Sequence, residues 1–117
     1  DIAVIVHPEN SASLDKKTIK KIFMGKVKKY ANGNVILPMN ASKDMASRDD
    51  FNKLAIGRTT AQVNAYWSKL VFTGKGTMPR ELTSDAEIIA TVSANKDAIS
   101  YVDASAVTDA VKVIATY

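Results

Sequence analysis

Hydrophobic residues follow two spacings along this chain, short continuous runs and helical periodicity, and the two alternate. Residues 2–6 form an apolar, mostly β-branched run that predicts a buried strand, and His7 and Pro8 end it. Pro38 is expected to end a second strand at residues 35–37, since proline cannot donate to a sheet ladder. Shorter apolar runs predict two further strands, at residues 98–102 and 111–116.

Helical spacing is clearest after Thr59, which forms a predicted capping box with Gln62. Behind this start, apolar residues recur at i, i+3, i+4, i+7 and i+8, namely Val63, Tyr66, Trp67, Leu70 and Val71. An earlier helix is expected from the N-cap Asp15 to Gly25. Glycine suits the backbone turn that follows a helix, so Gly25 is expected to end it.

Two more helices complete the pattern. One runs from Ser47 to Gly57 and the other begins at Ser84. The first is expected to turn three side chains inward, those of Phe51, Leu54 and Ala55. The predicted order is therefore β-α-β-α-α-α-β-β, with no linker or repeat. A chain of 117 residues in this order is expected to form one α/β domain, residues 1–117, with a small mixed sheet flanked by helices.

The composition is that of an ordinary globular protein, with 46% apolar and 24% charged residues. The absence of cysteine excludes disulfides, thiolate metal sites and cysteine nucleophiles. The only histidine, His7, lacks the partners of a catalytic triad. The adjacent Asp49 and Asp50 do not face each other on a helix, so they form no catalytic pair. We therefore expect no enzyme activity, no metal site and no cofactor.

The positive charge is concentrated in one segment. Seven lysines lie between Lys16 and Lys29, and Asp15, just before them, is the only acidic residue nearby. The leading interpretation is the solvated face of a helix, although such a cluster can also attract small anions, nucleic acid or an anionic membrane. Nucleic acid is not favoured, because only Phe23 and Tyr30 place aromatic rings among these lysines.

Two segments are candidates for contact with phosphate or a similar oxyanion. Residues 74–76, Gly-Lys-Gly, lack the full pattern of a phosphate-binding loop and are interpreted as a flexible connection. Residues 40–48 link a strand end to a helix start, where free N–H groups and the helix dipole favour an anion. The candidate ligands in this segment are Asn40, Ser42, Ser47 and Arg48. On the residues alone, the leading interpretation is that Ser47 only caps the helix and Arg48 lies on the surface.

Several short motifs occur in the order in which one protein family has them. They are His7-Pro8, Ile22-Phe23-Met24-Gly25-Lys26, Ser47-Arg48-Asp49-Asp50-Phe51, the segments 61–67 and 72–79, and Ala98-Ile99-Ser100-Tyr101-Val102. On these motifs the chain resembles the phosphate ABC transporter substrate-binding protein family, particularly its short single-domain members. The resemblance implies a single lobe of a type 2 periplasmic-binding-protein fold. It also implies a phosphate-type ligand and an ABC transporter membrane component as partner.

The candidate site departs from the pattern that the resemblance implies. Full-size members of the family carry an arginine after the second strand, followed by a Ser-Gly-Thr loop. Here Asn40 takes the place of that arginine, and no Ser-Gly-Thr occurs. Arg48 matches a position usual in the short members, whereas Ser100 stands where the family usually has glycine. The sequence therefore supports inheritance of the fold more strongly than inheritance of the ligand.

The leading hypothesis is a non-catalytic, solute-binding-like domain that binds phosphate or a similar oxyanion weakly, because one lobe buries only part of a ligand. The alternative is a structural, self-assembling protein, a homo-oligomer or filament, that kept the fold and lost the ligand. The resemblance implies export, so a periplasmic or secreted location with the signal peptide removed is expected. A chain that begins at Asp1 suits a processed terminus and equally a trimmed one.

Overall fold

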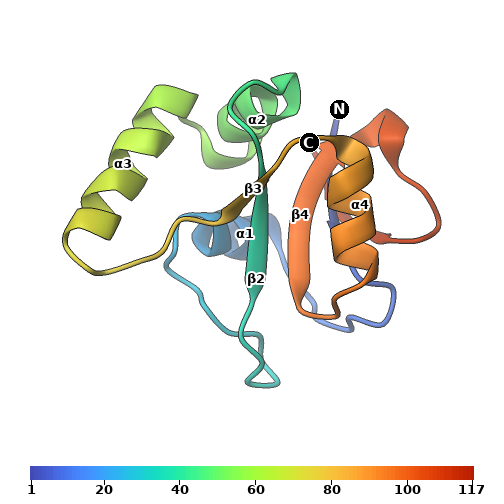
Figure 1. Cartoon of the computed structure of the whole chain (residues 1–117). Helices are drawn as coiled ribbons and strands as arrows, with labels where there is room; N and C mark the ends of the chain where they lie inside the picture. The colour runs from blue at the N-terminus through green and yellow to red at the C-terminus, as the bar shows by residue number, and fades with distance from the viewer.

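The computed structural model describes residues 1–117, and Figure 1 shows how their helices and strands are arranged. The strands are β1 (Ile2–Val6), β2 (Leu37–Ala41), β3 (Arg80–Leu82), β4 (Ala98–Asp103) and β5 (Lys112–Thr116). The helices are α1 (Lys16–Phe23), α2 (Ala46–Phe51), α3 (Thr60–Phe72) and α4 (Asp85–Ser93), with a π-helical turn (Asn52–Ile56) after α2 and a 3-10 turn (Ala104–Ala106) after β4. None of these helices has the length and apolar character that a membrane crossing requires.

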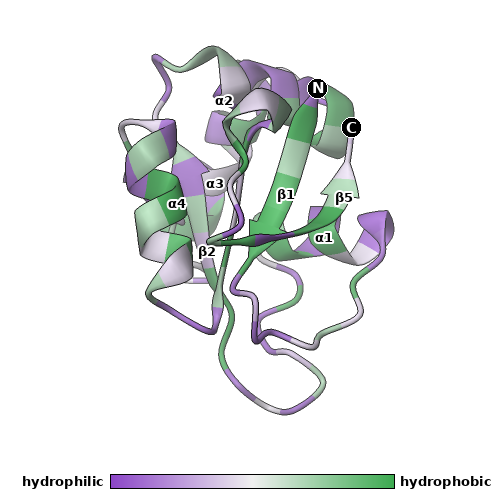
Figure 2. Ribbon diagram, turned by 90° about the vertical axis from the view of Figure 1, so that its right-hand side faces the viewer, coloured by the Kyte–Doolittle hydropathy of each residue, from purple (hydrophilic) through white to green (hydrophobic).

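The five strands form one mixed sheet in the order β3-β2-β4-β1-β5. Strand β2 pairs in parallel with β3 on one side and with β4 on the other. Strand β1 runs antiparallel to both β4 and β5. Figures 1 and 2 show α1 and α4 on opposite sides of this sheet. The predicted α/β class, with a small mixed sheet flanked by helices, is confirmed.

The core is built around β1. Each of its five residues is at most 2% exposed, because strands pair with both of its edges and helices cover the sheet. From α1, the side chains of Ile19, Ile22 and Phe23 pack into the same core. Ile88 and Val92 of α4 are also fully buried. The continuous apolar run at the start of the chain is therefore the buried strand that it predicts.

Most helix boundaries follow the predicted capping residues. The Asp15 side chain accepts the N–H of the third residue of α1 at 2.8 Å, and Thr59 begins α3 in a reciprocal capping box. Gly25 and Gly57 follow helical segments at φ angles of 73° and 81°. Glycine adopts this left-handed conformation without the clash that a side chain would cause. These predicted helix starts and ends are confirmed.

The second strand lies further along the chain than predicted, and the sequence pattern does not predict β3 at all. The prediction that Pro38 ends the strand is wrong, because Pro38 lies within β2. The Leu37 N–H points toward β4 and donates to the carbonyl of Asp97 at 3.0 Å. The nitrogen of Pro38 therefore faces the other side, where β3 begins only opposite Met39. No ladder bond is lost at the proline.

Three apolar side chains on the predicted elements are exposed, and two of them, Leu54 and Val71, were expected to face inward. Leu54 is 52% exposed because it lies in the π-helical turn, which places Ile56 in the core. Val71, in the last turn of α3, is 47% exposed. Val113 is 41% exposed because a bulge shifts the pairing of β1 with β5 and breaks the simple alternation.

The two ends of the chain lie side by side near the carboxyl end of β4, as Figure 1 shows. The Ile2 N–H donates to the Tyr117 carbonyl at 3.0 Å, and the Tyr117 N–H donates to the Ile2 carbonyl at 2.8 Å. The N–H of Ala104, just after β4, donates to the Asp1 carbonyl at 2.8 Å. These bonds fix both termini beside the end of β4.

Candidate functional site

The four predicted oxyanion ligands lie in one region, between the end of β2 and the first turn of α2 (Figure 1). Their surroundings differ. Ser42 is half-buried and Ser47 is 8% exposed, while Asn40 and Arg48 are buried at 4% and 0%. Only the serines combine a position at the loop with hydroxyl groups that are free of partners in the chain.

The start of α2 supplies hydrogen-bond donors that have no acceptor in the chain. The N-cap is Met45, whose side chain makes no capping hydrogen bond, so the prediction that Ser47 caps the helix is wrong. The N–H groups of Ala46 and Ser47 make no hydrogen bond within the chain. The Ser47 hydroxyl is buried and also lacks a partner. Buried hydroxyls usually have a hydrogen-bond partner. A polar ligand bound at this helix start would supply the partner that the Ser47 hydroxyl lacks.

Ser42 fixes the loop through its backbone and leaves its side chain free. Its N–H donates to the carbonyl of Leu82 at 2.9 Å, which joins the end of β2 to the end of β3. Its carbonyl accepts the N–H of Met45 at 3.0 Å. The Ser42 hydroxyl makes no hydrogen bond within the chain, so it remains available as a donor.

Asn40 is turned into the core rather than toward the loop. The Tyr101 hydroxyl donates to Oδ1 of Asn40 at 2.7 Å and accepts the N–H of Ala41 at 3.3 Å. The Tyr101 ring stacks on Phe51 with ring centroids 3.9 Å apart. Burial raises the pKa of the Tyr101 phenol, so it stays protonated and remains a donor. Asn40 therefore holds the end of β2 in place, and its side-chain oxygen already accepts a hydrogen bond from Tyr101.

Arg48 lies beneath the loop, and the interpretation of Arg48 as a surface residue is wrong. Its Nη1 donates to the carbonyl of Ala41 at 2.9 Å and lies 3.4 Å from Oε2 of Glu81. Its Nη2 donates to Oδ1 of Asn64 at 2.9 Å. The Nε atom is buried without a partner. The guanidinium thus ties the end of β2 to α3 and β3, and two of its nitrogens are already engaged.

Three residues that sequence reasoning does not single out hold this region together: Asn64, Glu81 and Tyr101. Asn64 lies three residues before Trp67, on the inward stripe of α3, where a polar side chain needs a partner. That position is a usable signal. Glu81 carries no such signal, because it belongs to the short strand that the sequence pattern does not predict.

The candidate site is an open surface. None of the four main pockets of the molecule is lined by Asn40, Ser42, Ser47 or Arg48. Within the loop, Lys43 and Asp44 are exposed. Such a surface can contact one side of a small anion but does not enclose it.

The lysine cluster and the histidine have simple surroundings. All seven lysines between Lys16 and Lys29 are exposed and none forms a salt bridge, in agreement with the solvated-face interpretation. The Lys16 ammonium lies 4.4 Å from the centre of the Tyr117 ring. The Nδ1 atom of His7 accepts the N–H of Glu9 at 3.0 Å, which suits a residue that shapes the turn after β1.

Comparison with solved structures shows which known proteins share this fold. An ABC-type phosphate transport receptor from Vibrio cholerae superposes with a TM-score of 0.76 at 15% identity, over 97% of this chain and 44% of the receptor. A putative phosphate ABC transporter substrate-binding protein with bound phosphate, from Clostridium perfringens, gives 0.76 at 22% identity, over 97% and 43%. A possible phosphate-binding protein from Planctomyces limnophilus gives 0.70 at 16% identity, over 97% and 40%.

These comparisons support a conclusion about the fold. The chain spans less than half the length of the matched receptors. No protein-family model and no curated protein sequence matches it. The resemblance to phosphate ABC transporter substrate-binding proteins is confirmed at the level of the fold. The shared fold corresponds to 44% and 43% of the first two matched chains, which are more than twice as long as this one.

Proposed function

We propose that this chain is a non-catalytic, solute-binding-like domain that binds phosphate or a similar oxyanion weakly. The observation that carries the proposal is the buried, unpartnered Ser47 hydroxyl beside two free N–H groups at the start of α2. Three donors and the positive end of a helix suit an oxyanion. The fold adds support, because one solved neighbour was obtained with bound phosphate.

The polar residues take different roles in this proposal. The N–H groups of Ala46 and Ser47 and the free Ser42 hydroxyl contact the anion, and a change of rotamer brings the buried Ser47 hydroxyl to it. Arg48 and Asn40 act as positioning residues, since their polar atoms bind the surrounding backbone and side chains. The Arg48 charge favours an anion above it, although Glu81 offsets part of that charge.

An open site of this kind is expected to bind with a Kd of about 1 mM or weaker, because solvent keeps contact with one side of the ligand. A second surface would close the site. We propose that it comes from an ABC transporter membrane component or from a second copy of the chain. This role places the protein outside the cytoplasm, periplasmic or secreted.

Titration of phosphate, followed by amide chemical shifts with sulfate as comparison, tests the proposal. Saturable shifts centred on Ser42–Ser47 are expected. Replacement of Ser47 by alanine should weaken binding about fivefold, the effect of one lost hydrogen bond. Ser68→Ala is the matched control, because Ser68 is an exposed serine on α3. If Ser47→Ala binds phosphate as tightly as Ser68→Ala, the assignment of the site is wrong.

A second candidate function is self-assembly, and one observation favours retaining it. Phe72, the last residue of α3, is 91% exposed and follows the half-exposed Val71. Exposed aromatic surface favours association between copies. Phe72→Ser should leave the free energy of unfolding within about 0.5 kcal/mol of wild type and weaken self-association measured by sedimentation equilibrium. At about 1 mM protein, an association free energy near −4 kcal/mol would already produce dimers. A wild-type protein that stays monomeric at this concentration therefore rules out the role.

A further inference from the structure

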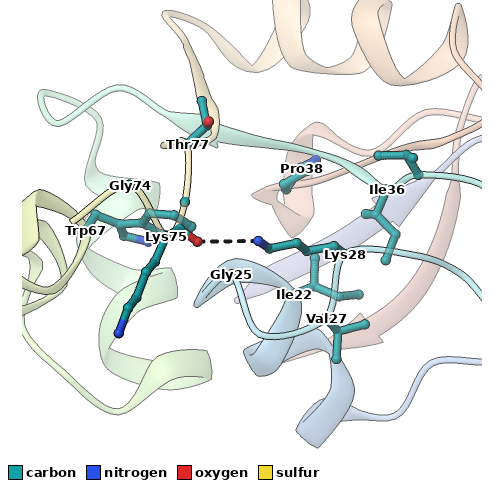
Figure 3. Close-up of a pocket in the computed structure, with 12 residues that line it drawn as sticks. Ile22, Gly25, Val27, Lys28, Ile36, Pro38, Trp67, Gly74, Lys75 and Thr77 are labelled. Atoms are coloured by element: carbon teal, nitrogen blue, oxygen red, sulfur yellow. Dashed lines mark hydrogen bonds between the residues drawn. The ribbon is translucent and has the colours of Figure 1, made fainter. Parts of the chain in front are cut away.

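A pocket of about 370 Å³ lies at the opposite end of β2 from the candidate oxyanion site. Three segments build it: the turn after α1, the approach to β2 at Val35–Pro38, and the loop Gly74–Thr77 after α3. Figure 3 shows Trp67 and Lys75 on one side and Ile36 and Val27 on the other, with the Lys28 side chain reaching between them. The sequence pattern predicts only a flexible connection at residues 74–76, and in the structure this loop packs against Trp67.

The tryptophan wall of this pocket is fixed in place. The Nε1–H of Trp67 donates to the carbonyl of Phe23 at 3.1 Å. Glycines from two distant segments approach the ring so closely that a Cβ on Gly25 would lie 2.7 Å from Cη2, and one on Gly76 would lie 3.2 Å from Cζ3. Both loops therefore need glycine where they meet the indole. The pocket is a consequence of packing between three segments and not of a loosely held surface loop.

The charge of the pocket has one sign. Lys28 and Lys75 are its only charged lining residues, neither forms a salt bridge, and no carboxylate lines it. The Lys28 ammonium donates to the Lys75 carbonyl at 3.4 Å, a long bond that leaves other hydrogens of the ammonium free. The N–H groups of Gly76 and Thr77 make no hydrogen bond within the chain. The pocket thus combines apolar walls with several donors and no acidic side chain.

We propose that this pocket binds a small organic carboxylate with an apolar body. The Lys28 ammonium meets the carboxylate, and the N–H groups of the glycine loop add donors to the same head group. Trp67, Val27, Ile36 and Pro38 contact the apolar body. The volume lies at the lower end of ligand pockets and holds a molecule of roughly ten to fifteen non-hydrogen atoms. The site is separate from the oxyanion site, and its ligand class is different.

The chain allows a direct test, because Trp67 is its only tryptophan. We would titrate 3-phenylpropionate and its neutral counterpart 3-phenylpropanamide into the wild-type protein, following Trp67 fluorescence and amide chemical shifts. Saturable binding of the carboxylate is expected, with shifts at Gly25 and Gly74–Thr77. The amide should bind at least fivefold more weakly, because it lacks the charge that Lys28 recognises. This comparison needs no variant, so it does not depend on the folding of one.

Variants then locate the charge. Lys28→Gln should weaken binding of 3-phenylpropionate about three- to tenfold. Lys17→Gln, which removes an exposed lysine at the start of α1, should leave binding unchanged. Equal binding of the carboxylate and the amide would overturn the proposal, and so would equal effects of the two lysine variants. If 3-phenylpropionate does not saturate the protein up to about 20 mM, a binding free energy weaker than about −2 kcal/mol, the proposal is overturned as well.

Inorganic phosphate separates this proposal from the proposed function. Phosphate should shift the amides at Ser42–Ser47 and leave those at Gly74–Thr77 unchanged, while 3-phenylpropionate does the reverse. If 3-phenylpropionate shifts only the Ser42–Ser47 amides, the pocket proposal fails and the oxyanion site stands. If phosphate displaces 3-phenylpropionate from the pocket at equal concentration, the apolar body contributes nothing and the proposal is overturned.

Discussion

Replacement of Arg48 by alanine tests whether this residue positions the loop or contacts a ligand. The fully buried guanidinium donates to the carbonyl of Ala41 and to Oδ1 of Asn64, both at 2.9 Å. Each bond from a charged donor contributes about 1.5–3 kcal/mol, and removing the donor leaves its acceptor unsatisfied. The pair with Glu81, whose side chain is 40% exposed, adds about 0.5 kcal/mol. Bonds made by one guanidinium do not add in full, so the expected loss of stability is about 3–5 kcal/mol, the range for removing one partner of a buried ion pair.

Thermal unfolding followed by circular dichroism measures this loss. An unfolding entropy of about 2.1 cal/mol/K per residue converts the expected loss to a fall in Tm of roughly 12–20 °C. Arg80→Ala, at an exposed position in β3, is the control and should change stability by less than about 0.5 kcal/mol. Arg48→Met keeps most of the volume and should lose less than Arg48→Ala. If Arg48→Ala keeps the wild-type Tm within about 2 °C but loses phosphate binding, the positioning role is refuted, and the guanidinium is a direct ligand.

Two further perturbations have directions set by the structure. Gly25→Ala places a methyl group 2.7 Å from Trp67 at a φ angle of 73°, and it should destabilise the protein by about 2–4 kcal/mol. Gly33→Ala is the control: its φ angle is 89°, no atom lies within 4 Å of the added carbon, and the expected loss of stability is about 1 kcal/mol. Equal losses in urea titrations would contradict the close contact. Burial raises the pKa of Asp85, so its contribution to stability is present below the usual pKa of aspartate and is lost as the pH rises through the raised value. Asp85→Asn should therefore raise Tm at pH 7 but not at pH ~3, and a gain that persists at pH ~3 would contradict the shift.

The sequence predicts the α/β class and most helix ends because these depend on local features. Asp15 and Thr59 cap helices through their own side chains, and Gly25 needs only its own freedom of rotation. The strand β3 lacks such a signal. Its Arg80 and Glu81 are exposed, so it forms no apolar run, and pairing with β2 alone makes it a strand.

The candidate site is predicted in position but not in detail. Residues 40–48 do link a strand to a helix, as the polar pattern indicates. The direction of each side chain depends on distant segments, however. Arg48 turns inward because Asn64 and Glu81, from α3 and β3, lie beneath it, and Asn40 turns inward toward Tyr101 of β4. Periodicity along the chain carries no information about these contacts.

The reciprocal hydrogen bonds between Ile2 and Tyr117 hold the two chain ends next to each other, the geometry that suits insertion of a domain into another protein. A longer polypeptide can enter and leave the fold at one point, so the unit can be inserted into a host chain without a long connection. The same bonds use only backbone N–H and C=O groups, which remain when either end continues into a further segment. They also allow the ends to be joined and the chain reopened elsewhere, for example in the exposed turn at Asn32–Gly33, with every strand keeping its neighbours.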